Sequence, residues 1–242
     1  MKILAFDTTA KIASVAVTDG ERALADYSIN NGLTQSELIL PMAENMLKSL
    51  GISFSDIELL AATVGPGSFT GVRIGAALVK GIAFDRNIPC VEVSTLESLA
   101  ENLAPLGKII VPCMDARRSQ VYNAIFSSDG EKLTRLTPDR AISLDELAEE
   151  LKAFDGERIY LSGDGYEIAH KRLSEIGVRL ERTPALLIEE SAVSCAKVAY
   201  RKFLAGEVTS DERFTPSYLR LPQAERERLE RLENKKIKDK ED

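Results

Sequence analysis

A glycine-rich segment with hydroxyl side chains is the first feature of this chain that could support chemistry. The segment at 65–75, GPGSFTGVRIG, follows an apolar run and places glycines four residues apart at Gly67, Gly71 and Gly75. A glycine-rich turn between a strand and a helix presents backbone N–H groups that can bind a phosphate. The segment lacks the Gly-Lys-Ser/Thr ending of a P-loop and the glycine spacing of the dinucleotide fingerprint. The alternative is that these glycines allow two backbones to pack closely.

Asp7 and Asp115 are the second such feature, and they lie at equivalent positions in two similar stretches. Each acid ends a short apolar strand, at 3–6 and at 109–114, and a polar turn and a second predicted strand follow. Two acids at the tips of duplicated hairpins could orient a magnesium nucleotide across a cleft. The alternative is that each carboxylate accepts hydrogen bonds from backbone N–H groups in its own turn, as short acids commonly do.

Other candidate nucleophiles, bases and ligands are few. His170 is the only histidine and falls in a predicted helix, where an isolated histidine is usually a surface or packing residue. Cys90, Cys113 and Cys195 are widely separated in apolar surroundings, which indicates reduced core thiols rather than disulfides or a metal site. Ser68 does not match the Gly-x-Ser-x-Gly nucleophile elbow and would need an adjacent base. We therefore expect no metal site, and a peptidase is the minor alternative function.

The predicted elements that position these residues occur in the same order twice. Each half has a hairpin, a third strand (23–29 and 133–141), a helix (35–50 and 144–154), and then a further strand and helix. A strand meander followed by β-α-β crossovers forms a mixed sheet with helices on its faces. Two such units are typical of the two-lobed actin-like (ASKHA, ribonuclease-H-like) α/β fold.

Composition and pattern divide the chain into four parts. We expect an N-terminal partner-binding lobe at 1–104, which ends where proline and glycine interrupt a helix, and a smaller second lobe at 105–190. Residues 191–220 are expected to form a final helix and a closing segment that pack back on the body. The remaining residues, 221–242, are almost wholly charged and are interpreted as a solvated tail.

Two predicted helices have faces that indicate an interface. The helix at 35–50 carries an apolar arc wider than one core contact requires, and the helix at 68–84 carries the glycine stripe. The residues expected to contact a partner or a second copy are Leu38, Met42, Met46, Gly71, Gly75 and Val79. The alternative is that both are core helices against opposite faces of the sheet.

Bulk composition restricts the partners and the compartment. A net charge of −7 argues against unaided nucleic-acid binding, which depends on clustered lysine and arginine, so we expect contact with RNA only through a partner. The chain begins directly with a strand, without a basic leader, and no apolar run is long enough to cross a bilayer. These features predict a cytoplasmic protein without membrane contact.

Three segments of the chain resemble the bacterial TsaB (YeaZ) family, whose members are needed for threonylcarbamoyladenosine synthesis on tRNA. They are 3–9 (ILAFDTT), 65–73 (GPGSFTGVR) and 114–122 (MDARRSQVY), and the motif at 216–220 (PSYLR) also resembles the family pattern. The resemblance extends over nearly all of the chain up to Arg220. The charged residues beyond that point are not part of the pattern.

The resemblance implies an actin-like fold and a non-catalytic scaffold subunit rather than an enzyme. Proteins of this family bind the catalytic paralogue TsaD through the two helices described above, and they self-associate through much the same surface. TsaD transfers the threonylcarbamoyl group to the adenosine adjacent to the anticodon, and the ATPase TsaE joins the complex. The implied partners are therefore a TsaD-like protein, a TsaE-like ATPase and a second copy, with tRNA contacted only through the complex.

The resemblance also implies what the chain does with nucleotides and metals. The family retains the interlobe cleft, and ATP or ADP can lie near the interface with the partner, so no cofactor is expected to bind tightly to this chain alone. The implied nucleotide contacts are Asp7, Thr8, Thr9, Gly65, Gly67 and Ser68. The catalytic paralogue holds a metal with two helical histidines, where this chain has Gln35, Ser36, Glu37 and Ile39.

An enzymatic alternative is an independent ATP-dependent small-molecule kinase or ATPase of the same fold. In that case Asp7 or Asp115 would orient Mg²⁺ and the glycine-rich turn would hold phosphate. Basic Arg117 and Arg118 stand beside Asp115 in place of a second glycine-rich phosphate loop, which disfavours this alternative.

Overall fold

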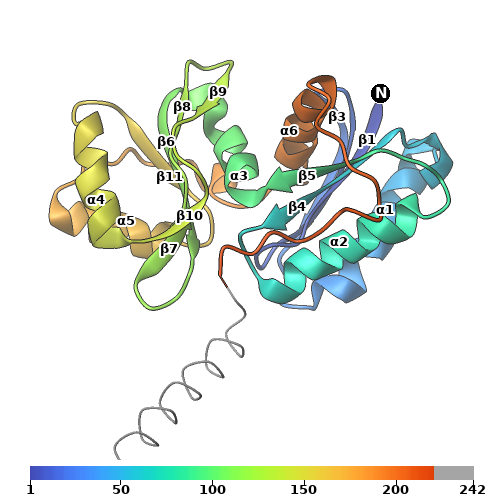
Figure 1. The fold of residues 1–242 in the computed structure, drawn as a ribbon, viewed down its shortest axis with the longest axis horizontal. Coiled ribbons are helices and arrows are strands. Elements are labelled where there is room, and N and C mark those ends of the chain that lie inside the picture. The colour runs from blue at the N-terminus through green and yellow to red at the C-terminus, as the bar shows by residue number, and fades with distance from the viewer. Residues whose placement is uncertain (221–242) are drawn as a thin grey trace, which may run out of the picture.

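The computed structural model describes residues 1–220, and the tail predicted at 221–242 lies outside the described residues. Two mixed sheets lie side by side, each flanked by helices, and the described chain ends where the two lobes meet (Figure 1). The predicted two-lobed actin-like α/β fold is therefore confirmed. Among the described residues, no helix has the length and apolar character needed to cross a membrane.

The first sheet has five strands in the order β3-β2-β1-β4-β5. Its strands are β1 (Lys2–Asp7), β2 (Ala13–Asp19), β3 (Arg22–Ile29), β4 (Leu59–Gly65) and β5 (Cys90–Ser94). Strand β1 pairs antiparallel with β2 and parallel with β4, so the carboxyl ends of β1 and β4 reach the same edge of the sheet. Both strands are buried on both faces because helices cover each side.

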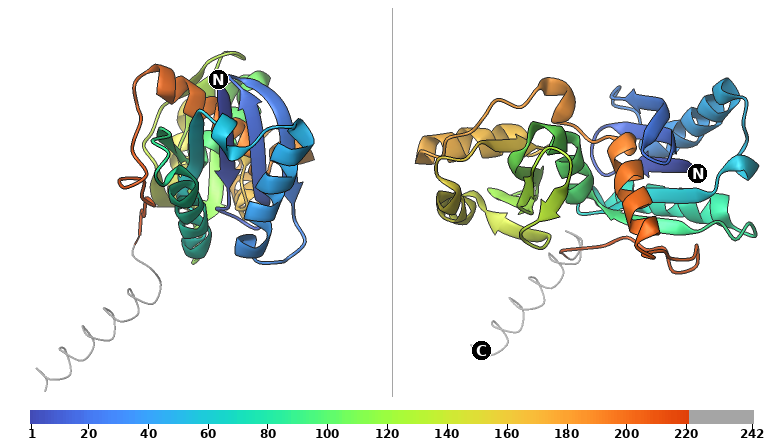
Figure 2. Two further views of the ribbon diagram at one scale, coloured as in Figure 1. Left: turned by 90° about the vertical axis from the view of Figure 1, so that its right-hand side faces the viewer. Right: turned by 90° about the horizontal axis from the view of Figure 1, so that it is seen from above.

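The helices of the first lobe bury opposite faces of this sheet. They are α1 (Gln35–Leu50), α2 (Phe69–Ala83) and, from the end of the chain, α6 (Ala192–Leu204), while α3 (Thr95–Leu103) leads from β5 to the second lobe. Helices α1 and α2 pack on the face that carries Leu4 and Phe6, whereas α6 packs on the face of Ile3 and Ala5 (Figure 2). The helix predicted at 35–50 is confirmed at both ends, and Gly51 ends it in a left-handed conformation.

The second sheet is built around β6. Its strands are β6 (Lys108–Asp115), β7 (Gln120–Asn123), β8 (Phe126–Ser128), β9 (Leu133–Arg135), β10 (Arg140–Ser143) and β11 (Ile159–Ser162). Strand β11 pairs parallel with β6 on one side, and β7 and β8 return along the other side. Helices α4 (Leu144–Leu151) and α5 (Tyr166–Ile176) cover one face and α3 covers the opposite face.

The single strand predicted at 133–141 is wrong, because β9 and β10 are separate short strands. Pro138 between them has no N–H to donate to a ladder. The backbone there bonds instead to Ile125, whose carbonyl accepts from Leu136 and Thr137. The Thr137 hydroxyl in turn accepts from the Ile125 N–H at 2.7 Å. The strand that returns along β6 is also interrupted next to this point, between the end of β7 at Asn123 and the start of β8 at Phe126.

The segment after α6, at 205–220, runs back across the first lobe and ends against the second; we name it the closing segment (Figure 1). Its Phe214 is fully buried in the core under α1 and α2. Farther along, the Ser217 N–H donates to the Val64 carbonyl at 2.8 Å. The closing segment thus contacts β4 and α2 just before it reaches the second lobe.

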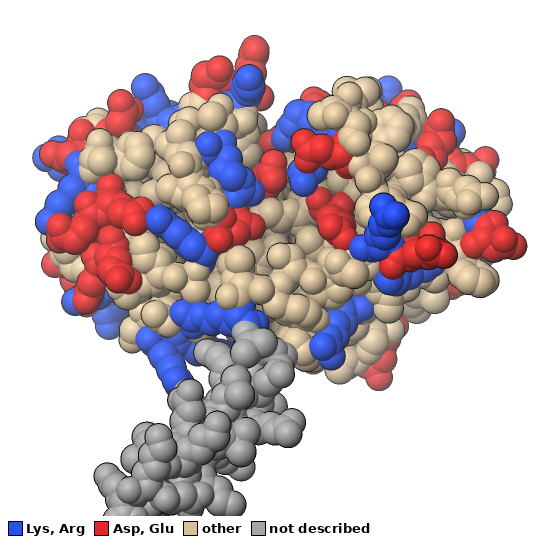
Figure 3. Space-filling model, viewed as in Figure 1, with Lys and Arg blue, Asp and Glu red and all other residues tan. Residues whose placement is uncertain are grey.

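Charge is unevenly distributed over the surface. Lysine and arginine side chains gather along the lower edge of the molecule, where the two lobes meet, whereas acidic and basic side chains are interspersed with uncharged surface over the rest of this view (Figure 3). In the interior, Cys90, Cys113 and Cys195 are free and buried, which confirms the prediction of core thiols. Burial raises the pKa of Cys113 to about 12, so this thiol is a packing residue.

Candidate functional site

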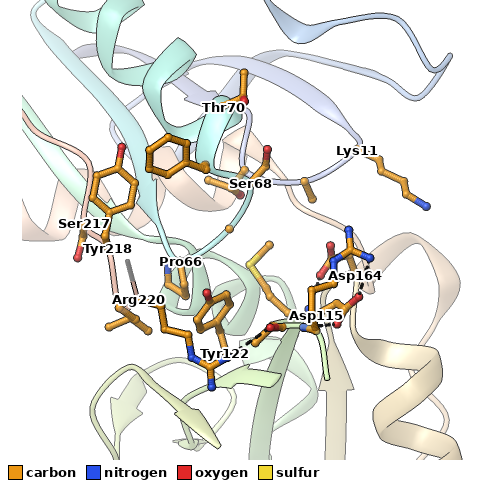
Figure 4. Close-up of a pocket in the computed structure, with 18 residues that line it drawn as sticks. Lys11, Pro66, Ser68, Thr70, Asp115, Tyr122, Asp164, Ser217, Tyr218 and Arg220 are labelled. Atoms are coloured by element: carbon orange, nitrogen blue, oxygen red, sulfur yellow. Dashed lines mark hydrogen bonds and ion pairs between the residues drawn. The ribbon is translucent and has the colours of Figure 1, made fainter. Parts of the chain in front are cut away.

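A hollow of about 500 Å³ opens where the carboxyl ends of β1, β4 and β6 meet between the lobes (Figure 4). We name it the cleft. Four chain segments and two further residues line it: 9–11, 66–70, 114–117 and 217–220, with Tyr122 and Asp164. Ligands of open α/β sheets commonly bind at the carboxyl ends of the strands, which makes the cleft the candidate site.

The turn before α2 is held by contacts within the chain. Gly65 has a φ of 122°, and a Cβ there would lie 2.5 Å from the Ser217 carbonyl oxygen. The Ser68 N–H donates to the Thr9 carbonyl at 2.7 Å, and its Oγ accepts from the Gly71 N–H at 3.2 Å. The Ser68 hydroxyl therefore caps α2.

The glycine stripe of α2 faces inward, toward the end of β1. The Thr8 hydroxyl donates to the Gly71 carbonyl at 2.7 Å, and a Cβ at Gly71 would overlap the Thr8 carbonyl oxygen. A Cβ at Gly75 would lie 2.8 Å from the Thr8 hydroxyl. These two glycines allow close packing inside the lobe, so the expectation that they contact a partner is corrected.

Three other residues expected to contact a partner are also buried in the core. The side chains of Met42, Met46 and Val79 are at most 5% exposed and pack under the first sheet. Leu38 is only half-buried, on the edge of the same cluster. The wide apolar arc of α1 is needed because the helix packs against both the sheet and α2, so it does not by itself indicate an interface.

Asp7 is buried and does not line the cleft. Its Oδ1 accepts from the Thr9 N–H at 3.0 Å and from the Thr9 hydroxyl at 2.7 Å. Burial raises the pKa of this carboxyl, and the hydrogen bonds from Thr9 only partly offset that effect. Of the six implied nucleotide contacts, Thr9, Gly67 and Ser68 line the cleft, whereas Asp7, Thr8 and Gly65 lie behind its wall. The expectation for those three as direct contacts is corrected.

Asp115 does reach the cleft, but its carboxylate is held by its own hairpin. Its Oδ1 accepts from the Arg117 N–H at 2.8 Å, and its Oδ2 lies 3.6 Å from the Arg117 guanidinium. The Asp115 N–H donates to Asp164 at 2.9 Å. Desolvation, with a smaller contribution from the Asp115 charge, raises the pKa of Asp164. Asp115 therefore accepts a hydrogen bond within its own turn, which is the alternative that the sequence analysis gave for this residue.

The tip of the β6–β7 hairpin is the most unusual backbone in the cleft wall. Arg117, Arg118 and Ser119 have φ values of 66°, 54° and 58°, and such left-handed conformations are uncommon for residues with a side chain. Arg220 of the closing segment supports the tip by donating to the Ala116 carbonyl and to Gln120. The sequence predicted a turn here, but not its left-handed backbone, because the turn contains no glycine.

Replacement of Arg220 by alanine is expected to loosen this hairpin tip while leaving the rest of the fold intact. Removing the guanidinium removes both hydrogen bonds that Arg220 donates to the tip. Hydrogen–deuterium exchange of the backbone amides at 116–120 should then become several times faster. Arg213→Ala removes an exposed arginine from the same segment and should leave that exchange unchanged. Equally slow exchange of these amides in both variants would show that the tip is stable without Arg220.

Residues for a peptidase or a metal site do not come together in the described part of the chain. His170 lies on α5 in the second lobe, where its ring stacks on Tyr166 at 5.4 Å, and Ser68 is used as a cap. Within residues 1–220 no three histidine, cysteine, aspartate or glutamate side chains are grouped so as to hold a metal ion.

Comparisons by sequence and by fold find the same group of known proteins. The TsaD family, described as tRNA N6-adenosine threonylcarbamoyltransferase, matches residues 34–228. The tRNA threonylcarbamoyladenosine biosynthesis protein TsaB of Bacillus subtilis is 30% identical over 240 residues, covering 95% of this chain and 99% of that protein. TsaB of Escherichia coli is 30% identical over 223 residues, covering 91% and 95%.

A solved structure of YeaZ from Pseudomonas aeruginosa superposes with a TM-score of 0.75 at 24% identity, covering 90% of this chain and 99% of that one. A second structure from the same organism, described as an uncharacterized protein with similarity to peptidase YeaZ, gives a TM-score of 0.77 at the same identity. At this identity the likeness shows the fold alone.

Proposed function

Because the chain belongs to the TsaB (YeaZ) family of tRNA threonylcarbamoyladenosine biosynthesis proteins, we propose that it is a non-catalytic subunit that binds and activates a TsaD-like paralogue. Its role lies in the biosynthesis of threonylcarbamoyladenosine on tRNA. The paralogue would transfer the threonylcarbamoyl group to the adenosine adjacent to the anticodon. We place this activity in the cytoplasm.

The observation that carries the proposed contact is an exposed small-residue face on α2. Gly81 is exposed in the last turn, and a Cβ there would have no atom within 4 Å, so packing inside the lobe does not explain this glycine. Ala77, one turn earlier, is exposed as well. An exposed helical glycine costs about 1 kcal/mol relative to alanine, and close approach of a partner helix would offset that cost.

The neighbouring surface supports the same contact. Helix α1 lies beside α2 and exposes Leu40 and Pro41 (Figure 2). Phe84, directly after α2, is 73% exposed. We therefore replace the five buried residues of the sequence prediction and keep Leu38, which gives an outer face made of Leu38, Leu40, Pro41, Ala77, Gly81 and Phe84. The same face would serve a homodimer when the paralogue is absent, and a TsaE-like ATPase would join the assembled pair.

The hydrogen bonding of Asp7 and Asp115 supports the proposed lack of catalysis. One Asp7 oxygen is occupied by Thr9 and the side chain is fully buried, while Asp115 accepts from its own turn. Neither carboxylate is poised for phosphoryl transfer. Any ATP or ADP in the cleft would contact Thr9, Gly67 and Ser68. It would lie near the interface with the partner, and this chain alone would bind it only weakly.

Light scattering after size exclusion tests the proposed pairing. The chain mixed with the TsaD-like paralogue should give a peak at the mass of a heterodimer or of a higher assembly containing both chains. Ala77→Arg places a long charged side chain on the proposed contact and should weaken the pairing at least about tenfold, because an unpaired charge would be buried. Titration calorimetry measures the affinity.

The matched control is Ala153→Arg, an exposed alanine at the far end of the second lobe, which should leave the affinity unchanged. Equal affinity for Ala77→Arg and the wild type would exclude α2 as the contact. Absence of any joint peak for the wild-type chains would exclude the pairing itself.

A further inference from the structure

The lower edge of the molecule is basic although the whole chain carries a net charge of −7. The side chains that make up this basic edge are Lys11, Arg73, Arg117, Arg118, Lys171 and Arg220. Asp115 and Asp164 line the cleft beside them, and Asp115, Asp145 and Glu175 line the second hollow, described below. Arg172 is close by, but it pairs with two acids, Asp145 at 2.8 Å and Glu175 at 3.7 Å, whereas within residues 1–220 Arg117 pairs only with Asp115 at 3.6 Å, so we exclude Arg172 from the basic edge.

The basic edge borders two adjoining hollows. The cleft lies on one side of Arg117, and a hollow of about 750 Å³ on the second lobe lies on its other side. Asp115 and Arg117 line both hollows, so the two adjoin at the hairpin tip, and we name the adjoining pair the trough. A trough of this length suits an extended polyanion better than a single small anion.

The arginines of the hairpin tip are held outward by a fixed backbone. The side chain of Arg117 is 81% exposed and Arg118 is also exposed, while the left-handed turn beneath them is supported by Arg220. Unusual backbone conformations persist where the surrounding structure enforces them, and they concentrate at functional sites. Two exposed arginines on a supported turn lose little freedom when they bind phosphate groups.

Aromatic side chains lie within the same trough. Tyr218 is 43% exposed and stacks on Phe69 at 5.0 Å, and its hydroxyl accepts from Arg73 at 2.8 Å. Tyr122 lines the cleft with Arg220 over its ring at 5.7 Å (Figure 4). Exposed aromatic rings beside arginines are the usual platform for unstacked RNA bases, whereas an acidic peptide has no need of them.

We propose that the basic edge contacts the sugar-phosphate backbone of tRNA directly while this chain is bound to its paralogue. This inference rests on the proposed function, which brings tRNA to the assembly. Arg117, Arg118 and Lys171 bind phosphates, and Tyr218 offers a stacking surface for a loop base. The acidic remainder of the chain keeps binding weak in the absence of the paralogue, since electrostatic attraction then acts over one edge only.

Fluorescence anisotropy of labelled tRNA with the assembled pair tests this proposal over a series of salt concentrations. Arg117→Gln/Arg118→Gln should weaken tRNA binding about tenfold or more and make the salt dependence shallower by about 1.5 in log–log slope, since two phosphate contacts are lost. Lys171 lies on the regular helix α5, so Lys171→Gln tests the tRNA contact without altering the strained turn. It should lower the affinity several-fold.

Lys152→Gln/Arg179→Gln removes the same charge from the far end of the second lobe and should leave tRNA affinity unchanged. Light scattering of each variant with the paralogue separates this proposal from the pairing. Lost tRNA affinity with pairing intact supports the proposal. Unchanged affinity and slope in both basic-edge variants would overturn it, and so would lost pairing, which would make the edge a protein interface.

Discussion

Replacing Gly71 by alanine is expected to lower the free energy of unfolding by about 3 kcal/mol or more. A Cβ at this position would overlap the Thr8 carbonyl oxygen, and a backbone atom cannot move aside as a flexible side chain can. The helix would have to shift away from β1. That shift would strain the hydrogen bond from the Thr8 hydroxyl to Gly71 at 2.7 Å and that from Ser68 to Thr9 at 2.7 Å.

Urea unfolding monitored by circular dichroism measures this effect, and the same helix supplies the control. Gly81→Ala adds the same methyl group to α2 where no atom lies within 4 Å. The control should be as stable as the wild type or more stable by up to about 1 kcal/mol, because alanine is the better helix former. Equal stability of Gly71→Ala and the wild type would contradict the close contact with Thr8.

The contrast between Gly71 and Gly81 shows which part of the interface could be predicted from the sequence. The spacing of Gly67, Gly71 and Gly75 correctly indicated close backbone approach, but not whether the approaching backbone belonged to this chain or to another. That distinction depends on where β1 ends in space, which periodicity does not encode. Gly81 lies outside the stripe of four-residue spacing that starts at Gly67, and only its open surroundings in the structure indicate an outward role.

The fold was largely predictable because its signals are local. Alternating and apolar runs placed β1, β2 and β4, and helical periodicity placed α1 to the residue. The strand predicted at 133–141 failed because Pro138 and the side chain of Thr137 redirect hydrogen bonds to Ile125, a contact between distant residues. The strand propensity of a segment does not predict which distant backbone groups it will hydrogen-bond to in the folded protein.

The candidate site was predictable only in part, because strand ends have local signals but side-chain roles depend on tertiary contacts. The hairpins that carry Asp7 and Asp115 were expected to face one cleft; Asp115 lines it, whereas Asp7 is buried behind it. The roles of individual side chains were not predicted, since Asp7 turns inward and Ser68 caps a helix. Arg220 and Tyr218 reach the cleft from the opposite end of the chain, and a position far away in sequence gives no local signal.

The buried acids behind the cleft carry the second large prediction. Glu190, just before α6, is 3% exposed, and neither of its carboxylate oxygens has a hydrogen-bond partner in the described structure. Burial raises its pKa well above the ordinary value, and the charge of Asp7 adds to the effect. The second oxygen of Asp7 is likewise without a partner, and burial raises the pKa of that group as well. The folded protein therefore holds protons that the unfolded chain releases.

The sign of the resulting pH dependence follows from this difference in bound protons. In the unfolded chain a glutamate ionises near its ordinary pKa of 4.5, whereas folded Glu190 stays protonated to higher pH. Between these two pKa values the free energy of unfolding falls by about 1.4 kcal/mol per pH unit for each retained proton. The protein should thus lose stability as pH rises from 5 toward its folded pKa, unlike a protein stabilised by ion-paired carboxylates.

Glu190→Gln should make the protein more stable than the wild type at pH 8, because an uncharged side chain has no proton to lose. Its advantage should grow as pH rises from 5 to 8 and shrink toward zero at pH 5, which melting temperatures across that range would measure. Asp7→Asn is a poorer probe, because Asp7 accepts two hydrogen bonds from Thr9 that an amide would weaken. Glu167→Gln, an exposed glutamate on α5, controls for the loss of a surface charge and should follow the wild type. A Glu190→Gln variant that melts below the wild type at pH 8 would show that the folded state binds this carboxylate in its ionised form.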